Sequence, residues 1–251
     1  MLIASLPFAR LLDRAQADDF PPSDTALILA VDVSNSVDAA RYKLQMEGIA
    51  QALEDPSVVN AITGGAKGGI LLSLVTWADH AHVALPWQPV RSASDAQAFA
   101  AKIRQVPQVA GEYTCTARMF EMIGDTIVPE IPAAAGHVVI DVSGDGIDNC
   151  GQPGDAAARR DDLVAMGATI NGLPIIVQGE NDIVGSGAYR APGYGLRELP
   201  KGPDSFTTTL DSWYNANVIG GPGRFLLKAN GFEDFGRAFR QKFVTEISAL
   251  D

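Results

Sequence analysis

The amino-acid sequence predicts an α/β protein built on a doubly wound, mostly parallel sheet with one antiparallel edge strand. Short apolar runs alternate with segments of helical period from Ser23 onward, which is typical of parallel strands joined by helices. Two apolar runs, 69–77 and 82–87, are separated by only a short turn. They must therefore pair as a hairpin, which adds an antiparallel strand at one edge.

The first half of the chain supplies three strands and two helices. The strand 26–33 is apolar, the strand 69–77 is rich in Leu and Val, and the strand 82–87 completes the hairpin. Two helices, 38–53 and 94–106, follow the first strand and the hairpin. Ser94 is expected to cap the second helix, and the first is expected to bury the apolar residues Leu44, Ile49, Ala50 and Leu53.

The second half continues the alternation after a polar loop, 111–116. The expected elements are a helix at 117–127, a strand at 137–140, a helix at 155–166, a strand at 169–177, a short helix at Trp213 and Tyr214, a strand at 224–228 and a helix at 232–250. The connection 178–206 is rich in Gly and Pro. A connection of this length is usually functional or mobile.

Composition limits the classes of partner. The chain has 251 residues, 47% hydrophobic and 20% charged, so it can bury a full core as one domain, 24–251. Its net charge of −11 argues against a nucleic acid or an anionic lipid surface as the main partner, because both would repel it.

The residues 1–23 are expected to be a signal remnant and linker. Pro7 and Arg10 interrupt the mildly apolar segment 1–14, so no transmembrane helix is predicted there. The small residues Ala15-Gln16-Ala17 are typical of a signal cleavage site. We therefore expect an exported protein, periplasmic or secreted.

A candidate metal site lies where the first strand ends. Asp32, Ser34 and Ser36 occupy alternate positions, so their side chains share one face of an extended chain. One carboxylate and two hydroxyls suit a hard cation such as Mg²⁺ or Mn²⁺. The alternative is structural: Asp32 and Ser34 stabilise a turn, and Ser36 caps the next helix.

Two further polar loops fall at comparable positions. Thr114 lies at the start of a helix, and Asp145-Gly146 follows the buried strand that begins at His137. Ligands of doubly wound sheets bind beyond the carboxyl ends of the strands, where the strand order reverses. These two polar loops are therefore expected to lie near Asp32.

The D-x-S-x-S pattern of Asp32, Ser34 and Ser36 resembles the metal-ion-dependent adhesion site of von Willebrand factor type A domains, which have a Rossmann-like sheet. That resemblance implies a threonine and a second aspartate before a glycine, roles that Thr114 and Asp145 match. Thr116 remains an alternative to Thr114, because Ala117 stands where many such domains have glycine. The segments 139–146, 170–175 and 218–223 are similar to a bacterial family of von Willebrand A-like proteins of unknown function.

The resemblance implies a function in protein binding rather than catalysis. In adhesion domains the cation completes its coordination with an Asp or Glu of a partner protein. The enzymatic alternative is a magnesium-dependent phosphatase or phosphotransferase with Asp32 as nucleophile. Phosphatases of the haloacid dehalogenase type have a second aspartate where this chain has Ser34, which cannot act as a general acid. A metal-free assembly scaffold is the third possibility.

Cys115 and Cys150 are the only cysteines, and each lies in one of the loops expected to reach the cation. If these loops converge in an exported protein, we expect a disulfide that keeps them in register. The alternative is a pair of free buried thiols.

Overall fold

The structure is a computed structural model that describes residues 20–185, 188–189, 197–198 and 206–248. The strands are β1 (Ser23–Asp32), β2 (Ile70–Trp77), β3 (Ala81–Val90), β4 (Ala135–Gly144), β5 (Ala168–Ile176), β6 (Ile183–Val184), β7 (Ala188–Tyr189), β8 (Arg197–Glu198), β9 (Thr208–Thr209) and β10 (Ala229–Asn230). The helices are α2 (Ala39–Glu54), α3 (Pro56–Gly64), α4 (Ala93–Ile103), α5 (Thr116–Met122), the π-helical turn η1 (Ile123–Ile127), α6 (Asp155–Ala165), α7 (Leu210–Asn217) and α8 (Phe235–Ser248).

The central sheet has six strands in the order β10-β5-β4-β1-β2-β3. Its neighbouring strands run parallel except for β2 and β3, which pair antiparallel as a hairpin. The predicted α/β class, with a mostly parallel sheet and one antiparallel edge strand, is confirmed.

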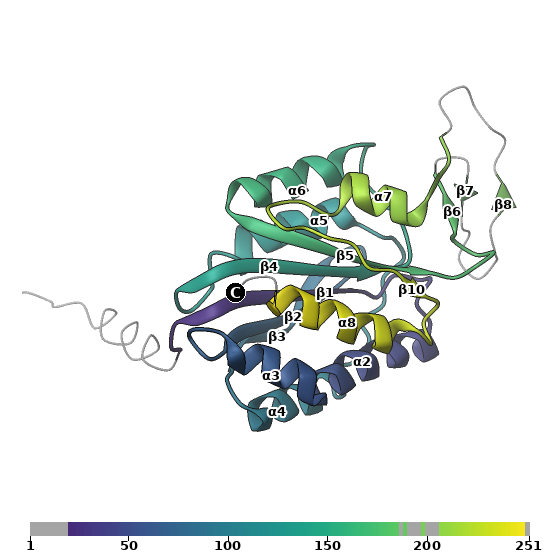
Figure 1. The fold of residues 1–251 in the computed structure, drawn as a ribbon. Coiled ribbons are helices and arrows are strands. Elements are labelled where there is room, and N and C mark those ends of the chain that lie inside the picture. Colours follow the sequence, from purple (N-terminus) through teal and green to yellow (C-terminus); the bar gives the residue numbers. More distant parts are fainter. Residues whose placement is uncertain (1–19, 186–187, 190–196, 199–205, 249–251) are drawn as a thin grey trace, which may run out of the picture.

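Helices cover both faces of this sheet (Figure 1). Helices α2, α3, α4 and α8 lie on one face, and α5, α6 and α7 lie on the other. Successive residues of β1 therefore contribute to different cores: Leu27 and Leu29 pack toward the first group of helices, and Ile28 and Ala30 toward the second. Burial on both faces explains why the central strands read as continuous apolar runs.

The strand register brings the ends of β1 and β4 together. Val31 of β1 is aligned with Ser143 of β4, and Asp32 is aligned with Trp77 of β2. The chain leaves β1 toward α2 on one face and leaves β4 toward α6 on the other. The loops after β1 and β4 consequently flank one point at the carboxyl edge of the sheet.

Two local predictions in the helices are wrong. Leu44 does not belong to the buried side of α2, since it is 38% exposed, whereas Tyr42 and Met46 are buried. Ser92 rather than Ser94 caps α4, because the Ser92 hydroxyl accepts a hydrogen bond from the backbone N–H of Asp95. Helix α4 thus begins and ends slightly earlier than its apolar period suggests.

Two further elements differ from the sequence prediction. Helix α3 was not predicted; it begins after Asp55, whose carboxylate accepts a hydrogen bond from the Ser57 N–H, with Pro56 in the first turn. The predicted last strand, 224–228, contributes only an isolated bridge at Leu226, and the paired strand is β10.

The predicted signal remnant lies almost wholly outside the described residues. In the described part of the chain, none of the helices combines the length and the apolar character that crossing a membrane requires. Parts of the connection 178–206 are also outside the described residues, while its described parts include β6, β7 and β8.

Candidate metal site at the carboxyl edge of the sheet

The three residues at the end of β1 lie close together, but through a turn rather than along an extended strand: β1 ends at Asp32, and the Val37 N–H donates to the Ser34 carbonyl at 2.8 Å. Asp32 is fully buried, and its Oδ1 accepts a hydrogen bond of 2.7 Å from the backbone N–H of Ser34. The hydroxyls of Ser34 and Ser36 lie 3.2 Å apart. The loop after β1 therefore presents one carboxylate and two hydroxyls to the same point.

The other two predicted ligands reach this point from separate loops. The Thr114 hydroxyl donates to the Ser34 hydroxyl at 3.2 Å, and the Ser36 hydroxyl donates to Oδ1 of Asp145. All five residues predicted from the sequence thus belong to one continuous set of polar contacts. Thr116 does not share in them, because its buried hydroxyl has no hydrogen-bond partner among the described residues.

The environment of the Asp32 carboxylate disfavours its negative charge. Its Oδ2 atom is buried without a hydrogen-bond partner in the described part of the molecule. Burial, followed by repulsion from Asp145, raises the pKa of Asp32 to about 7. Burial and the nearby carboxylates also hold the pKa of Tyr214 well above its usual value. A divalent cation would satisfy the orphaned oxygen and stabilise the ionised carboxylate.

Gly144 leaves the space in which Asp32 sits. A Cβ atom at position 144 would lie 2.8 Å from Oδ2 of Asp32 and 2.8 Å from the hydroxyl of Tyr214. Any other residue would therefore displace the Asp32 carboxylate or the tyrosine ring. The last residue of β4 must be glycine for the carboxylate to keep this position.

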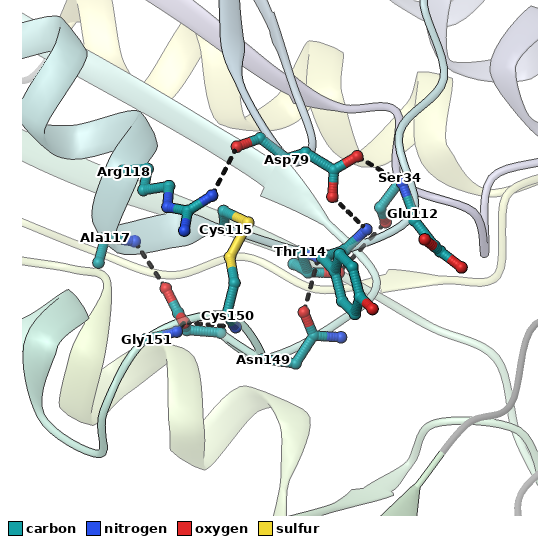
Figure 2. The surroundings of a disulfide bond; sticks show 12 residues. Ser34, Asp79, Glu112, Thr114, Cys115, Ala117, Arg118, Asn149, Cys150 and Gly151 are labelled. Atoms are coloured by element: carbon teal, nitrogen blue, oxygen red, sulfur yellow. Dashed lines mark hydrogen bonds between the residues drawn. A yellow bond between two sulfur atoms is a disulfide. The ribbon is translucent and has the colours of Figure 1, made fainter.

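A disulfide joins the loop that carries Thr114 to the loop after β4 (Figure 2). Cys115 and Cys150 are bonded, with their Cα atoms 5.4 Å apart. Next to this bond, Asn149 Oδ1 accepts from the Thr114 N–H at 2.8 Å, and the Asn149 N–H donates to the Thr114 carbonyl at 3.1 Å. Thr114 is therefore held by both a covalent and a hydrogen-bonded link to the loop after β4.

Two aspartates that sequence analysis missed order the backbone around Thr114 (Figure 2). The Asp79 carboxylate accepts hydrogen bonds from the N–H groups of Glu112 and Tyr113, at 2.7 and 2.9 Å. The Asp148 carboxylate accepts at 2.7 Å from the N–H of Ala117 in the first turn of α5. An aspartate in a turn can be recognised from the sequence. The N–H groups that Asp79 and Asp148 bind are distant in the sequence, so only the fold identifies them.

Three more residues that the sequence did not predict contact the site, one from α2 and two from the segment after β5. Arg41 Nη1 lies 3.9 Å from Oδ2 of Asp145, and Arg41 Nη2 donates to both oxygens of Glu180. The Asn181 side chain donates at 2.6 Å to the Asp145 carbonyl. Glu180 and Asn181 lie in a connection without hydrophobic period, so no sequence pattern indicated them.

The candidate ligand atoms are all oxygens, and most of them are uncharged. Within the described ranges, no cluster of three or more His, Cys, Asp or Glu side chains could hold a metal ion. The set here has only two carboxylates, Asp32 and Asp145, and its other oxygens are hydroxyls. Such ligands fit Mg²⁺ or Mn²⁺, which keep part of their water shell, better than a thiophilic metal.

The fold is that of von Willebrand factor type A domains. Proximal thread matrix protein 1 from the mussel byssus superposes with a TM-score of 0.61 at 13% identity, in a structure with a zinc-occupied MIDAS (metal-ion-dependent adhesion site) motif. The match covers 90% of this chain and 48% of that one. BatB from Bacteroides thetaiotaomicron has a TM-score of 0.55 at 16% identity, covering 90% and 99%. The von Willebrand factor type A protein from Catenulispora acidiphila has a TM-score of 0.56 at 15% identity, covering 90% and 43%.

The chain belongs to the family described as "Protein of unknown function (DUF1194)", whose model matches residues 22–251. The resemblance inferred from the sequence, to von Willebrand A domains and to a related family of unknown function, is confirmed. A comparison with curated protein sequences finds no match. The present chain spans about half the length of proximal thread matrix protein 1.

Proposed function

We propose that this protein is a non-catalytic module that binds a partner protein through a divalent cation. The observation that carries the proposal is the buried Oδ2 of Asp32, which has no hydrogen-bond partner in the described part of the molecule. The other oxygen of this carboxylate accepts from the Ser34 N–H, and the Ser34 hydroxyl contacts those of Ser36 and Thr114. The proposed ligands of Mg²⁺ or Mn²⁺, some of them acting through water, are Asp32, Ser34, Ser36, Thr114 and Asp145.

The charge of the proposed ligands supports protein binding. Two carboxylates and three hydroxyls leave an open position of a bound cation electrophilic, and a hard anionic oxygen completes it best. We therefore propose that the partner supplies an Asp or Glu carboxylate. The zinc-occupied MIDAS motif of the mussel protein supports the use of a divalent cation at this type of site.

The geometry gives less support to phosphoryl transfer. As a nucleophile, Asp32 would have to reach phosphorus, yet its side chain is fully buried and one oxygen is engaged by the Ser34 N–H. The hydroxyl of Ser34, two residues on, is too weak an acid to serve as a general acid at neutral pH. An assembly scaffold without metal is the remaining alternative, and metal binding distinguishes it from our proposal.

The proposed location is the periplasm or the exterior of a bacterial cell, with 1–23 as a signal remnant and linker and 24–251 as the binding domain. The disulfide between Cys115 and Cys150 supports an oxidising compartment. The net charge of −11 supports a protein partner rather than a nucleic acid.

The first prediction tests the cation directly. Mg²⁺ or Mn²⁺ should raise the melting temperature of the purified protein, because only the folded state assembles the ligands. Asp32→Ala and Ser34→Ala should abolish that increase while the chain still folds. Asp125→Ala and Ser94→Ala, at exposed positions, serve as matched controls and should keep the response.

An equal increase in all variants would show that the cation binds elsewhere. No increase in the wild type, together with no Mn²⁺ binding by titration, would favour the metal-free scaffold. Release of phosphate from model esters, lost in Asp32→Ala, would instead support the enzymatic alternative. Capture of a partner that persists in excess chelator would contradict the role of the cation in binding.

A further inference from the structure

The Arg41 guanidinium lies at the rim of the candidate site and contacts three of its loops. Nη1 donates at 3.0 Å to the Ser36 carbonyl and lies 3.9 Å from Oδ2 of Asp145. Nη2 donates at 2.9 and 2.8 Å to the two carboxylate oxygens of Glu180. The guanidinium also lies over the Phe232 ring, 5.0 Å from its centroid. These contacts give the positive charge one defined position beside Asp145.

The ion pair is accessible from solvent. The side chain of Arg41 is 21% exposed and that of Glu180 is 35% exposed, whereas the Asp145 side chain is fully buried. An approaching ligand therefore meets the Arg41–Glu180 pair before it reaches Asp145. Ion pairs that are partly exposed to water contribute little to stability, so another carboxylate can compete for Arg41.

The turn that carries Glu180 is held in place independently of the ion pair with Arg41. Its neighbour Asn181 is buried and fixes the turn: Nδ2 donates to the carbonyls of Asp145 and Ile175, and Oδ1 accepts from the Val177 N–H. The backbone at position 180 is thus anchored to the loop after β4 and to the end of β5 independently of the ion pair. Exchange of one carboxylate for another at Arg41 can therefore leave this backbone in place.

We propose that Arg41 is a second binding group for the partner's carboxylate, and that Glu180 occupies it in the free protein as an intramolecular competitor. This inference rests on the proposed function. The incoming Asp or Glu places one oxygen toward the cation and the other toward Arg41, while Glu180 turns into solvent. A guanidinium offers several donors in one plane, which matches a carboxylate better than a lysine ammonium does.

The proposal explains how an acidic protein can bind an acidic residue. The net charge of −11 repels a carboxylate at long range, and the two carboxylates of Asp32 and Asp145 formally balance the charge of a divalent cation. Arg41 adds a positive charge at the point of contact, and Glu180, which cancels that charge in the free state, is removed from it on binding. The gain is confined to short range, so it selects a carboxylate that also fits the cation.

A structural role for Arg41 and a binding role predict different results. If Arg41 only holds the loops together, its removal should weaken binding of both cation and carboxylate. If it binds the carboxylate, Arg41→Gln should weaken carboxylate binding yet strengthen Mn²⁺ binding, because a positive charge beside Asp145 is lost. Opposite signs for the two ligands are the diagnostic result.

The experiment uses Mn²⁺ and acetate as probes. Mn²⁺ affinity is obtained by titration, and acetate affinity from the loss of water-proton relaxation as acetate replaces water on bound Mn²⁺. Arg41→Gln should weaken acetate binding about tenfold, the worth of one charge-assisted hydrogen bond. Arg41→Lys should weaken it while leaving Mn²⁺ affinity near that of the wild type. Glu180→Gln should strengthen it about threefold, since the competitor is removed.

Arg104→Gln is the matched control, because Arg104 pairs with Glu47 and Glu54 on α2 and contacts none of the proposed ligands. It should leave both affinities unchanged. Equal acetate affinity in the wild type, Arg41→Gln and Glu180→Gln, with Mn²⁺ still bound, would overturn this inference and leave the proposed function intact. Weaker binding of both probes in Arg41→Gln would also overturn it, in favour of a structural role. Failure of the wild type to bind Mn²⁺ would overturn both.

Discussion

A buried charge cluster beneath α8 should make the stability of the protein depend on Glu246. Lys242 is fully buried, and its Nζ lies 2.5 Å from Oδ1 of Asp141 and 2.5 Å from Oε1 of Glu246. Asn171 donates at 2.7 Å to the same Glu246 oxygen, while Oε2 of Glu246 has no partner in the described part of the chain. One ammonium cannot fully compensate two buried carboxylates, so one of them should hold a proton.

The proton belongs on Glu246. Burial, followed by repulsion from Asp141, raises the pKa of Glu246 from 4.5 to about 8. Below pH 4.5 this carboxyl is protonated in both states; between 4.5 and 8 the unfolded chain has released the proton and the folded chain has kept it. Stability should therefore fall as pH rises through this window and level off above it. At about 1.4 kcal/mol per pH unit, the upper limit of the loss is about 5 kcal/mol.

The test compares urea unfolding of the wild type and Glu246→Gln from pH 5 to pH 8 in the presence of chelator. Glutamine resembles the protonated acid, so the variant should match the wild type near pH 5 and become the more stable of the two toward pH 8. Asp32 has a raised pKa of about 7 and adds a slope of the same sign. The difference between the two proteins at each pH cancels that contribution.

Glu54→Gln is the matched control. Glu54 is exposed and its pKa is lowered by Arg104, so its titration lies below the window. This variant should keep the slope of the wild type. If Glu246→Gln also keeps that slope, Glu246 is ionised throughout, and the reasoning from burial and from Asp141 is wrong.

The remaining predictions concern the disulfide and the contact between two helices. The double variant Cys115→Ser, Cys150→Ser should lose about 3 to 4 kcal/mol for a crosslink spanning 35 residues, and should bind Mn²⁺ more weakly; unchanged urea midpoints and titrations would contradict this. Gly48→Ala should lose about 1 to 3 kcal/mol, because its Cβ would lie 2.8 Å from Cα of Gly236, whereas Gly64→Ala, with nothing within 4 Å, should unfold like the wild type.

Much of the architecture was readable from the sequence because it depends on local patterns. Strands buried on both faces must be continuously apolar, and the helices between them must carry an apolar period. The antiparallel edge followed from the short turn between two apolar runs. Asp32, Ser34 and Ser36 were found from their alternation after an apolar run. They meet through a turn after β1, which that argument did not predict.

Local errors arose where two patterns compete. Leu44 fits an apolar period but is exposed, because α2 buries the neighbouring face with Tyr42 and Met46. Ser92 and Ser94 are both good caps, and only the packing of α4 decides which one begins the helix. Residues 224–228 are apolar enough for a strand, yet they lie beside β5 with only an isolated bridge.

The sequence by itself therefore determined the fold class and which residue types could form a site. Only the tertiary structure decided that the Thr114 hydroxyl, rather than that of Thr116, meets Ser34, and that Arg41 lies beside Asp145. It also decided that Lys242, on an amphipathic helix where a lysine would ordinarily face water, is buried against Asp141. These contacts join residues far apart in the chain, and their geometry depends on sheet register and helix packing, which no local period specifies.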